Sequence, residues 1–112
     1  MKNRTDTFFS APSAFTDSAA RHSNRPAVVT ESGSSWTYAQ LDARRIEAAR
    51  ALIGLGIAPG DRVAIWAQNC EEWIVAGLAV HSVGAAIVPI NTRMKGEEAG
   101  YVLTRSGARL LF

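Results

Sequence analysis

Residues 62–91 constrain the possible folds of this chain more than any other segment. They begin with an apolar run around Val63, which follows a Pro-Gly-Asp turn and predicts a buried strand. Residues 70–83 are apolar on nearly all sides and predict a helix that is buried on most of its surface. Gly84 can end this helix in the left-handed conformation, and residues 85–90 predict a second strand. A strand, a helix and a second strand in this order predict a parallel βαβ unit.

Capping signals mark the starts of two helices. Asn69 stands three residues before Glu72, which predicts a capping box at the start of the apolar helix. Thr37 and Gln40 have the same spacing and predict a second capping box, for a helix that runs to about residue 53. We expect the charged residues of this second helix to lie on its wetter side: Arg44, Arg45, Glu47 and Arg50. We expect its core side to consist of four apolar residues: Leu41, Ala48, Ala49 and Leu52.

The first part of the chain is expected to hold a helix and a hairpin. Residues 1–24 are interpreted as an N-terminal arm with a short helix over residues 11–21, whose first turn contains a proline. Residues 25–112 are interpreted as the α/β unit. Within it, residues 27–30 and 35–37 flank a glycine-containing turn and predict a β-hairpin.

Two further elements are expected after Asn91. A helix over residues 96–105, ended by Gly107, precedes a third apolar strand over residues 108–112. That strand would leave backbone groups and apolar surface uncovered, so we expect the remainder of a longer protein, or another copy of this chain, to cover the sheet edge. The predicted fold class is therefore α/β, with an N-terminal β-hairpin followed by βαβαβ and a parallel sheet.

The charge and the cysteine content exclude several classes of function. The 112-residue chain has a net charge of +2 and scattered arginines, which does not indicate nucleic-acid binding. The single cysteine, Cys70, excludes an internal disulfide and a multi-cysteine metal site, and we expect a cytoplasmic location. Residues 73–92 lack charged side chains over about the length of a bilayer span, but His81, Gly84 and Pro89 interrupt them. We therefore expect no membrane span.

In parallel α/β sheets, ligands bind where the carboxyl ends of the strands meet the following loops. After the first parallel strand, residues 67–72 contain no glycine and two acids, so close approach of a phosphate is unfavourable. Asn91-Thr92-Arg93 follow the second strand, and Arg93 could make a charge-assisted contact with a phosphate. The alternative is that Asn91 caps a turn and Arg93 is solvated. We keep both interpretations.

Individual residues with reactive side chains are weaker candidates for a functional site than residues 91–93. A helix amino terminus would activate the Cys70 thiol, but the adjacent Glu71 and Glu72 oppose this, and a packing role is favoured. His81 lies in the apolar helix, where a core histidine is favoured over a catalytic one. The three tryptophans are expected to belong to the core: Trp36, Trp66 and Trp73. No catalytic constellation is recognisable from the residues alone.

Five motifs between residues 25 and 112 resemble, in order and spacing, those of adenylate-forming enzymes, the AMP-binding superfamily. The first resembles T-Y-x-x-L and the second G-[VI]-x-x-G-D-x-V. The third resembles N-x-x-E-W/F, the fourth G-A-x-x-x-P-x-N, and the fifth is a later helix and strand. In this chain they occupy residues 35–41, 55–65, 69–73, 84–91 and 97–109.

The resemblance implies the N-terminal part of an acid:CoA ligase, and a fold that is a subdomain of the larger N-terminal domain of these enzymes. Such a ligase activates a small-molecule carboxylic acid with ATP and Mg to an acyl-adenylate, and then transfers the acyl group to CoA. Peptide-synthetase domains usually carry Asp-Pro after the second strand. Asn91-Thr92-Arg93 is more similar to fatty- and aromatic-acid CoA ligases. Together with Ile65-Trp66 and His81, this segment resembles ligases of lipid or sterol-side-chain catabolism. The resemblance places Asn91, Thr92 and Arg93 at the rim of the CoA site.

The family's phosphate loop, ribose-binding Asp and catalytic lysine all come after the matched stretch. We therefore assign no catalytic residue and no metal ligand to this chain, and expect it to be structural and inactive alone. Two alternatives remain open. One is a free-standing small α/β interaction module without catalysis, and the other is a small nucleotide-binding α/β domain.

Overall fold

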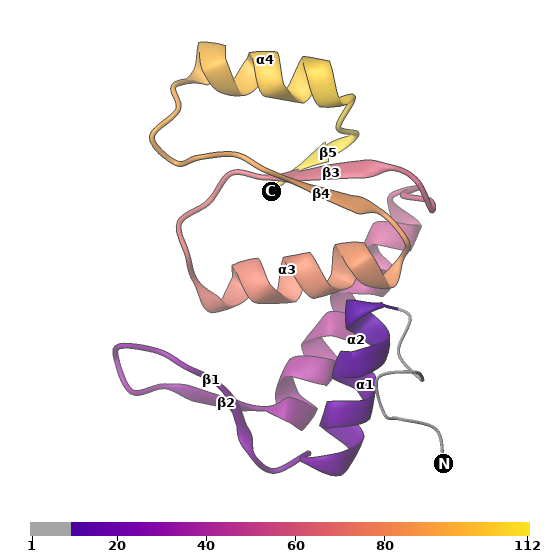
Figure 1. Cartoon of the computed structure of the whole chain (residues 1–112), viewed down its shortest axis with the longest axis vertical. Helices are drawn as coiled ribbons and strands as arrows, with labels where there is room; N and C mark the ends of the chain where they lie inside the picture. The colour runs from indigo at the N-terminus through magenta and orange to yellow at the C-terminus, as the bar shows by residue number, and fades with distance from the viewer. Residues whose placement is uncertain (1–9) are drawn as a thin grey trace.

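The computed structural model describes residues 10–112. The first nine residues of the expected N-terminal arm lie outside the described residues. A parallel sheet flanked by helices occupies one end of the molecule, and a helix pair with a hairpin occupies the other (Figure 1). The elements are α1 (Ala11–Arg21), β1 (Pro26–Val29), β2 (Ser35–Thr37), α2 (Tyr38–Gly54), β3 (Arg62–Ile65), α3 (Glu71–Ser82), β4 (Ala86–Pro89), α4 (Gly96–Ser106) and β5 (Leu110–Leu111).

The predicted parallel sheet is confirmed, with the strand order β4-β3-β5. The central strand β3 pairs in parallel with both neighbours, so that Val63 lies opposite Ile87 on one side and Leu110 on the other. Helix α3 covers one face of the sheet and α4 the other (Figure 1). The chain thus crosses from one edge of β3 to the other, and the two crossover helices lie on opposite faces.

The core is divided into two layers by β3. Val63, Ala64 and Ile65 are at most 1% exposed, because helices cover both faces of this strand. On one side, Leu52 of α2 and Val80 of α3 pack in the same cluster as Val63. Ala64 packs with Ile90 and with Ala99 of α4 on the other side. Burying one such large aliphatic side chain stabilises a fold by roughly 1.5–3 kcal/mol.

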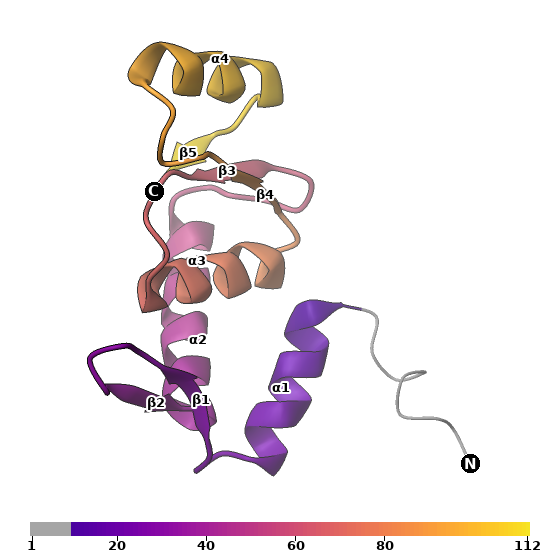
Figure 2. The same cartoon turned by 60° about the vertical axis from the view of Figure 1, so that its left-hand side comes forward.

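The hairpin and the first two helices follow the predicted local signals. Thr37 accepts a hydrogen bond from the Gln40 backbone N–H at 3.1 Å, and Gln40 Oε1 accepts one from the Thr37 N–H at 2.8 Å. The capping box of α2 is therefore confirmed. Figure 2 shows α1 beside α2, with the β1–β2 hairpin at the end of α2 that is remote from the parallel sheet.

The predicted capping box at Asn69 is wrong. Helix α3 begins one residue later than expected, with Cys70 as its N-cap in an extended conformation (φ −156°, ψ 171°) and no side-chain capping bond. Asn69 therefore precedes the N-cap and does not cap the helix. Glu71 and Glu72 still lie in that turn, where the helix dipole favours negative charge.

Helix α3 is covered over most of its surface, as the sequence predicts: among residues 71–82, only Glu72, Ile74 and His81 are exposed. Three other expectations about burial need correction. His81 is exposed, so it is not a core histidine, and Cys70 is exposed rather than packed. In α2, Arg45 does not lie on the solvent-exposed side but is largely covered between helices.

Candidate functional site

An open crevice lies at the carboxyl ends of β3 and β4. The loop after β3 leads to α3 on one face of the sheet, and the loop after β4 leads to α4 on the other (Figure 1). Adjacent strands whose connections leave in opposite directions form the crevice in which open α/β sheets bind ligands. The crevice has a volume of about 670 Å³. It is lined by Ala67, Gln68, Asn69, Trp73, Pro89, Ile90, Asn91 and Thr92.

The structure places Asn91 and Thr92 in the wall of this crevice. Asn91 Oδ1 accepts a hydrogen bond from the Arg93 backbone N–H at 2.9 Å, so Asn91 does cap a turn. The Asn91 carbonyl accepts a second bond from the Met94 N–H at 3.0 Å. Within residues 10–112, the exposed Arg93 side chain has no ion pair or hydrogen bond. The turn therefore holds Arg93 next to the crevice with its guanidinium open to solvent.

Sequence reasoning missed the opposite wall, which is built by Gln68, Asn69 and Trp73. The sequence predicts Trp73 in the core, but its half-buried ring lines the crevice. Gly77 leaves room for this ring, because a Cβ at that position would lie 3.3 Å from Trp73 Cζ3. The signal that could have found Gln68 and Asn69 is their place directly after the carboxyl end of the neighbouring parallel strand.

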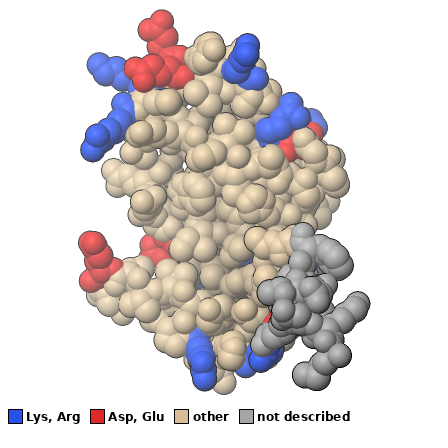
Figure 3. All heavy atoms as spheres, in the orientation of Figure 1, with Lys and Arg blue, Asp and Glu red and all other residues tan. Residues whose placement is uncertain are grey.

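The crevice itself is lined by no charged side chain. Basic side chains lie over the β4–α4 loop and acidic ones over the start of α4 (Figure 3). The loop contributes Arg93 and Lys95, and the first turn of α4 contributes Glu97 and Glu98. The site therefore suits a ligand with a neutral polar body and an anionic group at the β4–α4 loop.

The residues present do not fit a magnesium triphosphate. The loop after β3 contains no glycine, and the first turn of α3 carries Glu71 and Glu72, which would repel phosphates. Across the described part of the chain, no group of three or more metal-ligating side chains comes together. Likewise, no helix between residues 10 and 112 combines the length and the apolar character that a bilayer crossing requires.

A second cleft of about 680 Å³ lies between the β1–β2 hairpin and the start of α3. Glu31 from the hairpin and Glu71 from α3 line it, together with the exposed thiol of Cys70. Two carboxylates make this second cleft unfavourable for anions. The crevice at the sheet is therefore the better candidate for a phosphorylated ligand.

Comparisons with known proteins identify the family. The family model described as "AMP-binding enzyme" matches residues 15–112. A (7a-methyl-1,5-dioxo-octahydro-1H-inden-4-yl)propanoyl:CoA ligase of Mycobacterium tuberculosis is 57% identical over 65 residues, which are 58% of this chain and 13% of that protein. Surfactin synthase subunit 1 of Bacillus subtilis is 43% identical over 97 residues, which are 87% of this chain and 3% of that protein.

The fold agrees with these relatives. The crystal structure of a putative long-chain-fatty-acid CoA ligase from Rhodopseudomonas palustris superposes with a TM-score of 0.86 at 32% sequence identity, covering 92% of this chain and 26% of that one. This chain thus spans a small part of the length of the proteins it matches. The match extends from α1 to β5 and confirms the family predicted from the five motifs. The chain therefore belongs to the AMP-binding enzyme family.

Proposed function

We propose that this chain is the N-terminal part of a cytoplasmic acid:CoA ligase. Such an enzyme joins a carboxylate to the α-phosphate of ATP, with Mg, and releases pyrophosphate. The CoA thiol then displaces AMP from the acyl-adenylate to form the thioester. The observation that carries this proposal is the 57% identity over 65 residues to the propanoyl:CoA ligase of Mycobacterium tuberculosis.

The substrate that we propose is a lipid-derived carboxylic acid. The Mycobacterium tuberculosis relative is named for a propanoyl group on a fused, methylated diketone ring system, and a second ligase of the same name from Rhodococcus jostii is 40% identical over 88 residues. Both names describe a carboxylic acid with a bulky alicyclic body. The resemblance of the sequence to ligases of lipid or sterol-side-chain catabolism agrees with this class of acid.

Residues 1–112 have a structural role in this proposal, and the catalytic residues lie elsewhere in the whole protein. Asn91, Thr92 and Arg93 form the rim of the CoA site. Arg93 would contact a CoA phosphate, and the turn capped by Asn91 would hold its backbone in place through the 2.9 Å bond. The free guanidinium beside an uncharged crevice supports this assignment.

Arg93→Ala in the full-length protein tests the proposal. The variant should raise the KM for CoA by about 10- to 100-fold, because a hydrogen bond to a charged group contributes about 1.5–3 kcal/mol. Acid-dependent ATP–pyrophosphate exchange should stay unchanged, since CoA takes no part in adenylate formation. Arg105→Ala is the matched control, because it removes an exposed arginine from the far end of α4. An unchanged KM for CoA would contradict the role of Arg93.

A second candidate is an adenylation domain that loads a carrier protein instead of CoA. The 43% identity to surfactin synthase subunit 1 over 97 residues favours it. Peptide-synthetase domains usually carry Asp-Pro where this chain has Asn91-Thr92, which favours the CoA ligase. Acyl-CoA formation by the full-length protein from acid, ATP and free CoA would show that it is a ligase. If acyl-CoA does not form while ATP–pyrophosphate exchange is intact, the protein is an adenylation domain.

A further inference from the structure

One edge of the β1–β2 hairpin is open. Within residues 10–112, β1 pairs with β2 alone, and Val29 lies opposite Ser35. The next residue, Thr30, donates its backbone N–H to the Ser34 carbonyl at 2.9 Å. Because successive residues of an antiparallel strand point to opposite edges, the N–H and C=O of Val29 face away from β2. An unpaired edge of this kind can accept a further extended segment through backbone hydrogen bonds.

The second cleft runs along this open edge. Residues 28–32, from β1 and the turn after it, line the cleft, whereas none of the described β2 residues 35–37 does. The start of α3 forms the other wall. Two large apolar side chains of the cleft are exposed, Val29 at 67% and Ile74 at 40%. Their burial would be favourable, so the cleft suits an occupant with apolar groups.

The charge of the second cleft narrows the choice of occupant. Glu31 and Glu71 are the charged residues among those that line it in the described part of the chain. Two carboxylates beside a strand edge favour a partner strand that carries a lysine or an arginine. They disfavour a second copy of this chain, because pairing of two β1 edges would bring the carboxylates of both copies together.

We propose that the second cleft is the docking site of an extended segment from the remaining part of the same protein, which adds to β1 as a further strand. An apolar residue of this segment packs against Val29 and Ile74. A basic residue of the segment pairs with the carboxylates of Glu31 and Glu71.

The source of the segment is inferred from the length of the relatives. The inference rests on the proposed function only because that function makes the chain part of a longer protein. The matched residues are 13% of the Mycobacterium tuberculosis ligase and 26% of the Rhodopseudomonas palustris structure. A segment of the same polypeptide is favoured over a separate protein, because covalent linkage gives it a high effective concentration at the cleft.

Photo-crosslinking of the purified full-length protein tests the docking. A diazirine analogue of leucine in place of Val29 should crosslink to a residue outside 1–112 that has a lysine or an arginine within two positions. The same analogue in place of Ile53 is the matched control, because Ile53 is 62% exposed on α2 and does not line the cleft. It should not crosslink to that segment. A crosslink between two copies, a site without a basic neighbour, or no crosslink outside residues 1–112 would overturn the inference.

Hydrogen exchange of the full-length protein gives a second readout, which needs no variant. The Val29 amide should exchange at least about 100-fold more slowly than an unprotected amide, because the added strand accepts its hydrogen bond. Exchange of the Val29 amide at the unprotected rate would overturn the inference.

Charge reversal in the full-length protein tests the basic partner. Glu31→Lys/Glu71→Lys should lower the thermal midpoint by about 2–4 °C more than Glu97→Lys/Glu98→Lys. The control pair removes two acids from the first turn of α4, so it loses at least as much interaction with a helix dipole, and neither residue lines the cleft. Equal midpoints of the two double variants would overturn the choice of a basic segment.

The docking and the proposed function can fail separately. If the Val29 crosslink forms in a protein that makes no acyl-CoA, the ligase assignment is wrong and the docking is supported. If the protein makes acyl-CoA but the crosslink does not form, the docking is wrong and the ligase assignment is supported.

Discussion

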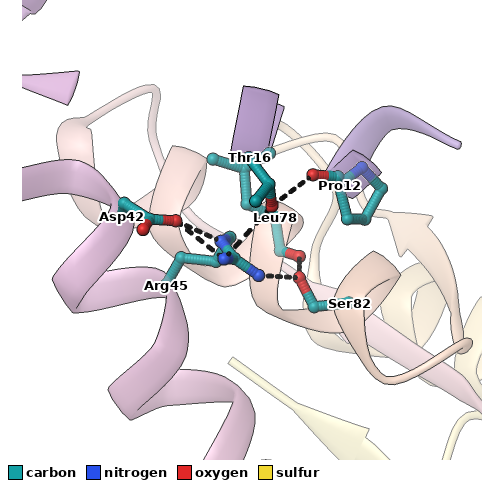
Figure 4. A network of polar contacts seen from close by, with 6 residues as sticks. All are labelled: Pro12, Thr16, Asp42, Arg45, Leu78 and Ser82. Atoms are coloured by element: carbon teal, nitrogen blue, oxygen red, sulfur yellow. Dashed lines mark hydrogen bonds and ion pairs between the residues drawn. The ribbon is translucent and has the colours of Figure 1, made fainter. Parts of the chain in front are cut away.

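Arg45 of α2 donates a hydrogen bond to the Ser82 hydroxyl of α3 across 3.0 Å (Figure 4). The guanidinium also contacts Asp42 Oδ1, at 2.7 Å from Nη2 and 3.0 Å from Nε, and reaches Thr16 Oγ1 of α1 at 3.5 Å. Ser82 in turn donates to the Leu78 carbonyl at 2.6 Å. One arginine side chain, 12% exposed, therefore connects three helices.

Replacing Arg45 should destabilise the protein. Arg45→Met keeps most of the length of the side chain but leaves Asp42 and Ser82 without their partner, so the free energy of unfolding should fall by about 1–3 kcal/mol. Arg50→Met is the matched control in the same helix, because Arg50 is exposed and should change stability by no more than about 0.5 kcal/mol. Urea unfolding of both variants measures the difference. Equal effects would show that the network contributes nothing.

Asp61 should make stability depend on pH in acid. Its carboxylate accepts hydrogen bonds from the Ala58 N–H at 2.8 Å and from Arg109 at 3.1 Å, and these lower the pKa of Asp61, with the backbone bond as the largest cause. A lowered pKa in the folded state stabilises the fold above the ordinary pKa of an aspartate, and the contribution is lost as the pH falls through the lowered value. Asp61→Asn should therefore be less stable than the wild type at neutral pH, and the free energies of unfolding of the two proteins should converge in acid. A difference between these free energies that stays constant at every pH would contradict this role of Asp61.

Two glycines of the α4 region should respond in opposite directions to alanine. Gly107 has φ +66°, and a Cβ there would lie 2.8 Å from the Arg62 guanidinium that binds the Ser106 carbonyl. Gly107→Ala should therefore lower the free energy of unfolding by about 1–2 kcal/mol. Gly100→Ala, inside α4 with nothing within 4 Å, should raise it by about 0.5–1 kcal/mol. Thermal unfolding of the two variants measures both changes in stability. A shift of the unfolding midpoint in the same direction in both variants would contradict these roles of the two glycines.

Most helix boundaries could be predicted from the sequence because they depend on groups a few residues apart. The Thr37–Gln40 box is closed by the two residues themselves, and Gly107 ends α4 through its own backbone conformation. Asn69 was the exception. The helix started one residue later than the pattern indicated, so the side chain with capping ability fell outside the cap.

The candidate site could be predicted only in part. The position after the carboxyl end of a strand pointed to Asn91 and Thr92. Gln68 could have been added from its place after the carboxyl end of β3. Trp73 could not, because only the packing of α3 on the sheet brings its ring to the crevice. Apolar character alone made Trp73 a core residue in the sequence interpretation.

The sequence by itself determined the type and order of the elements, since capping, turn and strand signals act between near neighbours. Only the tertiary structure decided which way the charged and polar side chains face. Helical periodicity groups residues on one face but does not say which face meets another element. Arg45 is covered because Ser82, 37 residues later, comes to lie against it, whereas His81, the next residue to Ser82, points to solvent.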